Sequence, residues 1–190
     1  MARKKNYEDN DVIEKATELF WRNGYENTSM SLLESTMGIN KFSIYSSFGS
    51  KQGVFLRSLR CYRNKLSPVV IKLKHSNDGR AAIKQYFYDC LATYTDAICS
   101  KGCLMTNTRA ELSGHVNGET NAEILNEIES FVHYQKQLFI EKLLADGEDI
   151  ISATKKANYL IIAKQAISSA SKVHSLHEIN DFIDITFSSI

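Results

Sequence analysis

Apolar residues recur at helical spacing along most of this chain of 190 residues. Near the N-terminus, five of them fall at positions i, i+1, i+4, i+7 and i+8, which is one face of an amphipathic helix. These five are Val12, Ile13, Ala16, Leu19 and Phe20. No stretch alternates apolar and polar residues over a useful length, and the chain has one proline. We therefore predict an all-α protein.

The segment 28–53 predicts two short helices, a tight turn and the start of a third helix. Either Thr28 or Ser29 can cap the first short helix, because a hydroxyl there accepts a hydrogen bond from the free N–H groups of the first turn. Gly38 stands where that helix must end, and glycine adopts the left-handed backbone conformation without strain.

Asn40 can cap the second short helix, over about 41–48, and Ser50 can cap a third helix that begins at Lys51. Two helices joined by a glycine-containing turn of three to four residues form a helix-turn-helix, whose second helix enters the major groove of DNA. This pattern indicates a protein that reads DNA.

The rest of the chain predicts a larger helical unit. A long helix should run from Lys51 to about Lys74, kinked or broken by Pro68 because proline lacks the backbone N–H. Further apolar stripes predict helices over about 83–98, 103–112, 124–143, 148–171 and 179–190. We expect residues 1–50 to form a three-helix DNA-binding domain and residues 51–190 a helical ligand-binding and dimerisation domain.

The charge distribution agrees with a DNA-binding N-terminal third. Residues 1–65 carry 11 Lys and Arg against 7 Asp and Glu, whereas residues 66–190 carry 12 against 15. The stretch 35–77 has no acidic residue and eight basic ones. A chain with a net charge of +1 therefore has a basic N-terminal part, which is what phosphate binding requires. A solvated, charge-biased face is the alternative interpretation.

In the stretch from Val12 to Phe55 the chain resembles the TetR family of transcriptional regulators. One group of matching positions resembles the family's first helix and its exit: Ala16, Leu19, Phe20, Gly24 and Tyr25. A second group follows the helix-turn-helix positions in order and spacing: Thr28, Leu33, Gly38, Ile39, Lys41, Ile44, Tyr45, Phe48, Ser50 and Lys51.

The resemblance implies that Thr28, Tyr45 and Lys51 hold DNA phosphates. A basic arm at residues 3–5 could lie against the backbone or reach into the minor groove. The predicted DNA-binding residues are Arg3, Lys4, Lys5, Thr28, Ser29, Lys41, Phe42, Ser43, Tyr45, Ser46, Ser47 and Lys51.

The resemblance also implies that Lys41, Phe42 and Ser43 approach the bases. Lysine can bind a phosphate or read guanine, and serine is a permissive reader. The chain departs from the family at Met37, Asn40 and Phe42. Phe42 matters most, because it begins the recognition helix and could pack on a thymine methyl group. A partner of this kind would be a palindromic operator in double-stranded DNA.

The last two predicted helices are apolar enough to form a dimer interface. The first is rich in isoleucine and alanine over a wide arc, and the second repeats apolar residues at i, i+3, i+4, i+7 and i+8. Paired with a second copy, they would make a four-helix bundle, as in the family. Alternatively, both helices close the core of a single chain. The predicted interface residues are Leu160, Ile161, Ile167, Ile179, Phe182, Ile183 and Phe187.

Members of the family usually bind a small molecule in the C-terminal domain, so we also expect a cavity there for an unknown effector. Its candidate walls are mostly aromatic or apolar with a few polar groups, the usual composition of such a site, although the same residues at helical spacing could form ordinary core. They are Tyr86, Phe87, Cys90, Tyr94, Cys103, Met105, Asn107, Phe131 and Tyr134.

The segment 101–107 resembles a glycine-cysteine-leucine motif of one subgroup of the family, in which some members sense electrophiles or oxidants. Cys103 would lie at a helix N-terminus, where the helix dipole stabilises a thiolate, with Lys101 adding charge. Cys99 lies four residues before Cys103, about one helical turn away. The alternative to a ligand-released regulator is thus a redox or electrophile sensor, or a helical redox protein, acting through Cys103; an inert buried thiol is the third interpretation.

Other classes of function find no support in the sequence. The four cysteines do not have the spacing of a zinc site, no nucleophile–base or paired-carboxylate arrangement is evident, and no apolar run reaches the length of a membrane span. We expect no metal, no cofactor and no enzymatic activity. The chain is interpreted as a cytoplasmic, homodimeric transcriptional regulator, most simply a repressor released from DNA by a small molecule.

Overall fold

The computed structural model of the chain describes residues 7–94, 100–113 and 121–190. The described part contains nine α-helices, which confirms the predicted all-α class. They are α1 Asp9–Asn23, α2 Met30–Met37, α3 Lys41–Phe48, α4 Lys51–His75, α5 Gly79–Tyr94, α6 Leu104–Ser113, α7 Ala122–Ala145, α8 Ile150–Ala170 and α9 Leu176–Ser188.

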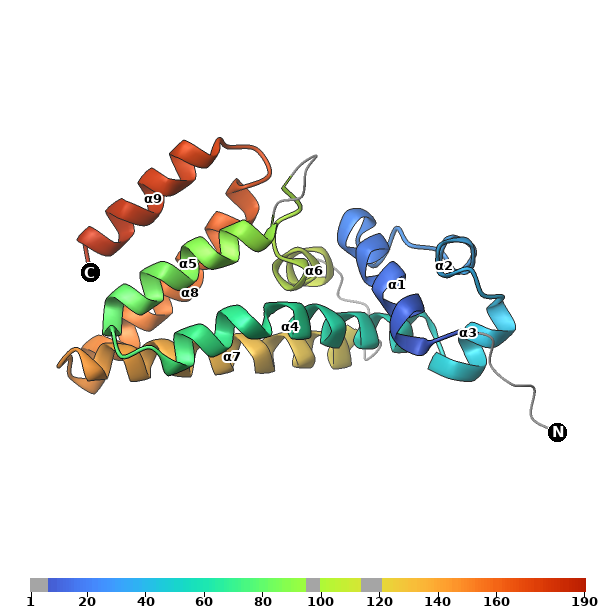
Figure 1. Cartoon of the computed structure of the whole chain (residues 1–190), viewed down its shortest axis with the longest axis horizontal. Helices are drawn as coiled ribbons and strands as arrows, with labels where there is room; N and C mark the ends of the chain where they lie inside the picture. Colours follow the sequence, from blue (N-terminus) through green and yellow to red (C-terminus); the bar gives the residue numbers. More distant parts are fainter. Residues whose placement is uncertain (1–6, 95–99, 114–120) are drawn as a thin grey trace.

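Helices α1, α2 and α3 gather at one end of the molecule, around the first turns of α4 (Figure 1). The ring of Phe20 on α1 meets the ring of Phe55 on α4 edge to face, with 4.7 Å between centroids. Leu33 on α2 and Ile44 on α3 are fully buried in the same core. The short helices are therefore held by apolar contacts with α1 and α4, because neither is long enough to be stable in isolation.

Local capping places α2, α3 and α4 where the sequence predicts them. The Ser29 hydroxyl accepts from the Leu32 N–H, the Asn40 carbonyl oxygen from the Ser43 N–H, and the Ser50 hydroxyl from the Gly53 N–H. Gly38 ends α2 in the left-handed conformation, at φ 70°. Each cap satisfies N–H groups that the first helical turn leaves free.

Helix α4 passes from the N-terminal end to the far end of the molecule, alongside α7 (Figure 1). It continues through Pro68 to His75, so of the predicted kink or break at Pro68 the break is absent. Pro68 itself faces solvent, while Leu66, Val70 and Leu73 are buried on the inner side. Burial of that inner stripe outweighs the one helical hydrogen bond that the proline removes.

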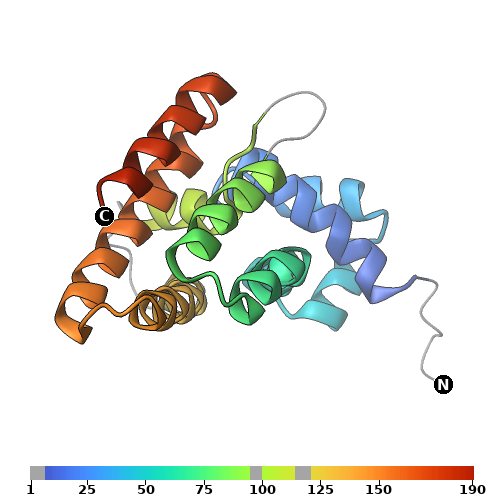
Figure 2. The same cartoon turned by 60° about the vertical axis from the view of Figure 1, so that its left-hand side comes forward.

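The C-terminal half is a helical bundle in which α7 and α8 form a hairpin and α9 packs on α5 (Figure 2). Phe87 on α5 contacts Phe187 on α9 edge to face, with 5.1 Å between centroids. On its other side α5 packs against α7, where the centres of the Tyr86 and Phe139 rings are 5.7 Å apart. These aromatic contacts fix α5 at the centre of the bundle.

Candidate nucleic-acid interface

Helix α3 buries one side chain fully, half-buries Ser43, Ser47 and Phe48, and exposes the others. Ile44 is fully buried and anchors α3 on the N-terminal core. On the opposite face lie Lys41, Phe42, Tyr45 and Ser46, all exposed. Phe42 and Tyr45 are 80% and 51% exposed, although each carries a large aromatic ring. The predicted recognition surface is therefore open, with a cation, two aromatic rings and a hydroxyl on one short helix.

Two residues that the sequence analysis missed hold α3 in place. The hydroxyl of Tyr7, just before α1, lies 2.8 Å from the Ser47 hydroxyl at the end of α3. At the other end, the Glu34 carboxylate of α2 accepts a hydrogen bond from the Lys41 N–H over 3.0 Å. Because Ser47 is half-buried and bonded to Tyr7, its structural role competes with its predicted role toward DNA. No local pattern in the sequence signals either contact.

Thr28 differs from its predicted role. Its side chain is fully buried, and its hydroxyl donates to the Gly24 carbonyl over 2.7 Å. A hydroxyl in this position closes the turn between α1 and α2, so in this conformation it cannot reach a phosphate. The prediction of a phosphate contact through the Thr28 side chain is wrong, and Ser29 beside it acts as the helix cap and is exposed.

Lys51 lies at the start of α4, where it is half-buried. Its ammonium donates to the Glu26 carbonyl over 3.3 Å and lies 4.5 Å from the centre of the Tyr25 ring. Partial burial lowers the pKa of Lys51, against the opposing effect of the Glu26 and Glu111 carboxylates. The predicted basic arm, Arg3, Lys4 and Lys5, lies outside the described residues.

The acid-free stretch 35–77 acquires acidic partners from distant parts of the chain. Arg63 pairs with Glu127 of α7 at 2.6 Å, and Lys72 with Asp89 of α5 at 2.7 Å. Lys41, Arg57 and Arg60 are exposed. The positive surface is therefore smaller than the sequence suggests, since the distal half of α4 is neutralised by the bundle.

Helix α6 joins the N-terminal domain to the bundle. Its Glu111 carboxylate accepts hydrogen bonds from the backbone N–H groups of Tyr25 and Glu26, over 3.0 and 2.8 Å. Gly24 allows this approach, because a Cβ there would lie 2.8 Å from a Glu111 oxygen. We call this contact the α6 clasp: Glu111 and the backbone of residues 24–26.

A second contact joins the segment before α6 to α1. The Trp21 indole N–H donates to the Gly102 carbonyl over 2.8 Å. The Lys101 ammonium binds the Glu18 carboxylate at 3.0 and 3.1 Å and lies 4.1 Å from the centre of the Trp21 ring. Any displacement of α6 is thus transmitted to α1 at two places.

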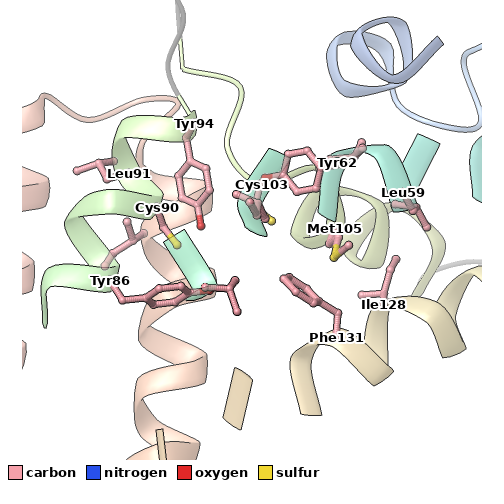
Figure 3. Packing of buried hydrophobic residues seen from close by; sticks show 14 of the residues in the cluster. Leu59, Tyr62, Tyr86, Cys90, Leu91, Tyr94, Cys103, Met105, Ile128 and Phe131 are labelled. Atoms are coloured by element: carbon pink, nitrogen blue, oxygen red, sulfur yellow. The ribbon is translucent and has the colours of Figure 1, made fainter. Parts of the chain in front are cut away.

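The predicted effector-binding residues separate into several groups. Tyr86, Cys90 and Tyr94 are buried together on α5, with Cys103 and Phe131 close by (Figure 3). Three of the predicted residues do not belong to this group. Phe87 fills the core against α9, Tyr134 is 41% exposed, and Asn107 donates to the Lys101 carbonyl beside α1. These three therefore lie apart from the buried group, and Asn107 lines a different pocket, between α1 and α6, because helical spacing does not fix which way each arc of a helix faces.

A small cavity lies between α6, α7 and α8. Its walls include Cys103 and Met105 at the start of α6, Phe131 and Gln135 of α7, and Lys164 of α8. The volume open to a water-sized molecule is about 20 Å³, room for about one water. Pockets that bind drug-sized ligands have volumes of roughly 300–1,000 Å³, so the side chains here must move before an effector can enter.

The two described cysteines near the cavity are buried. Cys103 immediately precedes α6, as predicted, and its N–H donates to the Ser168 hydroxyl over 2.8 Å. Burial raises the pKa of Cys90 to about 11, so this thiol is protonated near neutral pH. Cys99 lies outside the described residues.

The predicted dimer residues largely fill the core of one chain. Leu160 and Ile183 have no exposed surface, and Ile167, Ile179 and Phe187 have little. Ile161 is half-buried and lines the cavity. Of the predicted set, Phe182 is 41% exposed and Ile161 partly exposed, whereas the other five residues are buried within one chain. The exposed apolar residues of α8, α9 and the turn between them are instead Ile150, Ile151, Tyr159, Ile162, Val173, Leu176 and Ile185.

No group of three or more His, Cys, Asp or Glu side chains among the described residues could hold a metal ion. Within the same residues, none of the helices combines the length and the apolar character that crossing a membrane requires.

Comparison with known proteins assigns the N-terminal part to a family. Residues 12–57 match the model for bacterial regulatory proteins of the tetR family. The chain is 27% identical to the uncharacterized HTH-type transcriptional regulator YezE of Bacillus subtilis, covering 99% of this chain and 98% of that one. It is 25% identical to IcaR of Staphylococcus aureus, the negative transcriptional regulator of the biofilm operon icaADBC, covering 78% and 81%.

Solved structures show the same fold over nearly the whole chain. A cysteine-substituted form of the TetR family transcriptional regulator CifR, complexed with operator DNA, has a TM-score of 0.84 at 19% identity and covers 99% of both chains. The reduced form of Escherichia coli NemR has a TM-score of 0.71 at 18% identity, covering 96% and 95%. With its N-terminal residues matched in sequence and its full length matched in fold, this chain is similar to the tetR family of bacterial regulatory proteins.

Proposed function

We propose that the protein is a homodimeric repressor that binds a palindromic operator in double-stranded DNA and leaves it when a small molecule occupies the C-terminal domain. The observation that carries this proposal is the exposed face of α3, with Lys41, Phe42, Tyr45 and Ser46 presented by a helix anchored through buried Ile44. A rigid short helix with exposed readers is what entry into the major groove requires.

The comparisons with known proteins support the same proposed function. IcaR is named as a negative transcriptional regulator, and CifR was solved with double-strand operator DNA. AibR, whose fold is similar with a TM-score of 0.67, was solved with both isovaleryl coenzyme A and operator DNA. A protein of this fold can therefore hold a small molecule and DNA, which are the two partners that we propose here.

The path from ligand to DNA runs through α6. An effector that widens the cavity displaces Met105 and its neighbours on α6, and α6 carries Glu111 of the clasp. The loop after α1 then moves with it, and the orientation of α3 changes. In a dimer, two recognition helices must lie about 34–36 Å apart, or a multiple of this, to read a palindrome. A ligand that favours another orientation lowers operator affinity by population shift.

Selection from a random double-stranded DNA library at two salt concentrations tests the proposal. We expect a palindrome, bound less tightly at the higher salt because phosphate contacts release counterions. Lys41→Ala and Tyr45→Phe should weaken operator binding. Lys41→Ala should also reduce, by about 1, the slope of the logarithm of the binding constant against the logarithm of salt concentration. The matched control is Lys74→Ala, an exposed lysine in the last turn of α4, which should bind as the unchanged protein does. Failure to recover any sequence at either salt would refute the proposal.

A second candidate, a thiol-based sensor, rests on Cys103, which lines the cavity at the start of α6. An electrophile small enough to enter the cavity would alkylate this thiol and displace α6. In that case N-ethylmaleimide should release the operator from the unchanged protein and not from Cys103→Ala. Equal release from both proteins, or from neither, would exclude Cys103 as the sensor.

A further inference from the structure

The cavity between α6, α7 and α8 contains a buried cation without an acidic partner. Lys164 of α8 is only 8% exposed. Among the described residues it has no carboxylate within ion-pairing distance and no hydrogen bond; its ammonium lies 6.0 Å from the centre of the Tyr86 ring. Burial of an unpaired charge is costly, so proteins rarely keep one that has no function.

A second charged side chain that lines the cavity is also positive. Arg109 of α6 also lines it, and its guanidinium makes only a loose contact of 3.8 Å with the exposed Glu129. No aspartate or glutamate is among the described residues that line the cavity. The wall facing Lys164 is apolar, with Ile128, Phe131 and Val132 on α7. The cavity thus combines positive charge with apolar surface.

Two tyrosine hydroxyls beside this cavity are also without ordinary partners. Tyr62 and Tyr94 are each 1% exposed, and their hydroxyls have no hydrogen bond of normal geometry among the described residues. The Tyr62 hydroxyl lies beside the thiol of Cys103, which lines the cavity, and the Tyr94 hydroxyl beside the thiol of Cys90; thiols are weak hydrogen-bonding groups (Figure 3). Buried hydroxyls normally find a partner, and these two can donate to an acceptor that enters next to these thiols.

From this arrangement we infer that the effector is a small organic anion, with one carboxylate or similar group and an apolar body. The inference rests on the proposed function, because it names the chemical class of the effector at that site. The anionic group lies near Lys164, and the apolar body lies against α7. A cationic effector is excluded, since it would bring a third positive charge beside Lys164 and Arg109. The effector makes room by displacing flexible side chains such as Met105.

Binding of three probes with the same apolar chain and different head groups tests this inference. The probes are octanoate, octanamide and octylamine, with benzoate as a rigid carboxylate. The fluorescence of Trp21, the one tryptophan of the chain, reports binding because its indole N–H bonds the Gly102 carbonyl next to Cys103. We expect octanoate or benzoate to bind, octanoate about tenfold or more tightly than octanamide, and octylamine to bind weakest.

Lys164→Gln should abolish the preference for octanoate over octanamide, whereas Lys155→Gln, an exposed lysine on the same helix, should preserve it. Lys164→Met distinguishes a binding role from a structural one. If Lys164 serves a ligand, removing its unpaired charge should raise the midpoint of thermal unfolding of the free protein by about 2–4 °C for each 1 kcal/mol gained. A lower midpoint would mean that the lysine stabilises the fold and would contradict the inference.

Equal binding of octanoate and octanamide, or no binding of either carboxylate, would overturn the inference. Operator binding by the same preparation without probes keeps this result separate from the proposed function. A protein that binds its operator but prefers octanamide or octylamine remains a regulator with an effector of another class. A protein that binds carboxylates but no DNA retains this site and loses the proposed function.

Discussion

Phe42 is an aromatic residue at a position of α3 where it contributes almost nothing to the core. With 80% of its surface exposed, it gains little from folding, and we propose that its ring contacts the operator. We expect Phe42→Ala to change the free energy of unfolding by no more than about 0.5 kcal/mol. The same change should weaken operator binding by about 1–3 kcal/mol, mainly at one base-pair position, as loss of a thymine-methyl contact would.

Competition binding against operators with single substitutions would measure this effect. Ser46→Ala, on the same exposed face, is the comparison because it removes a hydroxyl and little apolar area. Uniform weakening across all operator variants would show that Phe42 contributes to affinity without reading sequence.

The buried hydroxyls and thiol of α5 make stability sensitive to alkaline pH. Burial raises the pKa of Cys90 from 9.0 to about 11 and raises the pKa values of Tyr86 and Tyr94 well above 10.0. Above pH 9 the unfolded chain loses protons that the folded chain retains, so the folded state binds more protons and its stability falls as pH rises. Below pH 9 these groups contribute no pH dependence.

Urea unfolding at intervals from pH 7 to pH 10.5 tests this behaviour. The unfolding midpoint should fall once the pH passes about 9, the unperturbed value of the thiol. Cys90→Ala should flatten the first part of the decline, between pH 9 and 10, where the tyrosines do not yet titrate. An identical decline in Cys90→Ala would mean that this thiol does not carry the effect.

At the scale of elements, α6 is the connection that we propose between effector and DNA. The Glu111 carboxylate accepts two backbone N–H groups from the loop after α1, and charged acceptors make the stronger hydrogen bonds. Glu111→Gln keeps the shape of the side chain and removes its charge. We expect a loss of about 1.5–3 kcal/mol in the free energy of unfolding. We also expect the effector to release the operator less completely, because α6 would move without carrying the loop.

Chemical unfolding and operator titration with and without effector would measure both effects. Glu129→Gln is the control, because Glu129 is exposed and makes only a contact of 3.8 Å with Arg109. A variant that unfolds more easily yet responds fully to effector would show that the α6 clasp is structural and does not transmit the signal.

At the scale of the whole molecule, the exposed apolar residues of α8 and α9 give the surface on which we propose dimerisation. Ile162 on α8 and Ile185 on α9 are each 66% exposed, and Tyr159 lies one turn from Ile162. A charge at Ile162 would have to be buried in the dimer without a partner. Ile162→Glu should raise the dimer dissociation constant by about 30-fold or more.

Light scattering after size-exclusion chromatography, over a range of protein concentrations, would measure the dissociation constant. Ile71→Glu is matched in chemistry, since Ile71 is 52% exposed but lies on α4. The mass distribution of the Ile71→Glu variant should equal that of the unchanged protein. If Ile162→Glu leaves the distribution unchanged and Ile71→Glu alters it, the interface involves α4.

Local interactions explain which features could be predicted from the sequence. The caps at Ser29, Asn40 and Ser50 and the left-handed Gly38 depend on residues three or four positions away, so the sequence determines them directly. The buried anchor Ile44 and the exposed face of α3 follow from helical spacing in the same way. The helix-turn-helix and the exposed face of α3 were therefore predictable from the sequence alone.

The direction that each C-terminal helix faces was not predictable in this way. Helix α8 is apolar on nearly every side, so periodicity could not show that Leu160 points into the core and Ile162 into solvent. Nor could any local pattern place Thr28 in a buried turn. The sequence suggested the number, length and order of the helices, while packing decided which face of each helix is covered.

Only the tertiary structure determined the contacts between residues that are far apart in the chain. Glu111 reaches the loop after α1, Glu127 neutralises Arg63, and Lys164 lies beside a cavity with no ion-pair partner among the described residues. Each depends on how two helices are placed relative to one another, which side-chain spacing within one helix does not encode. The sequence by itself determined a helical, DNA-reading framework, because its signals are local; the tertiary structure alone determined how α6 joins its two halves and which charge faces the cavity.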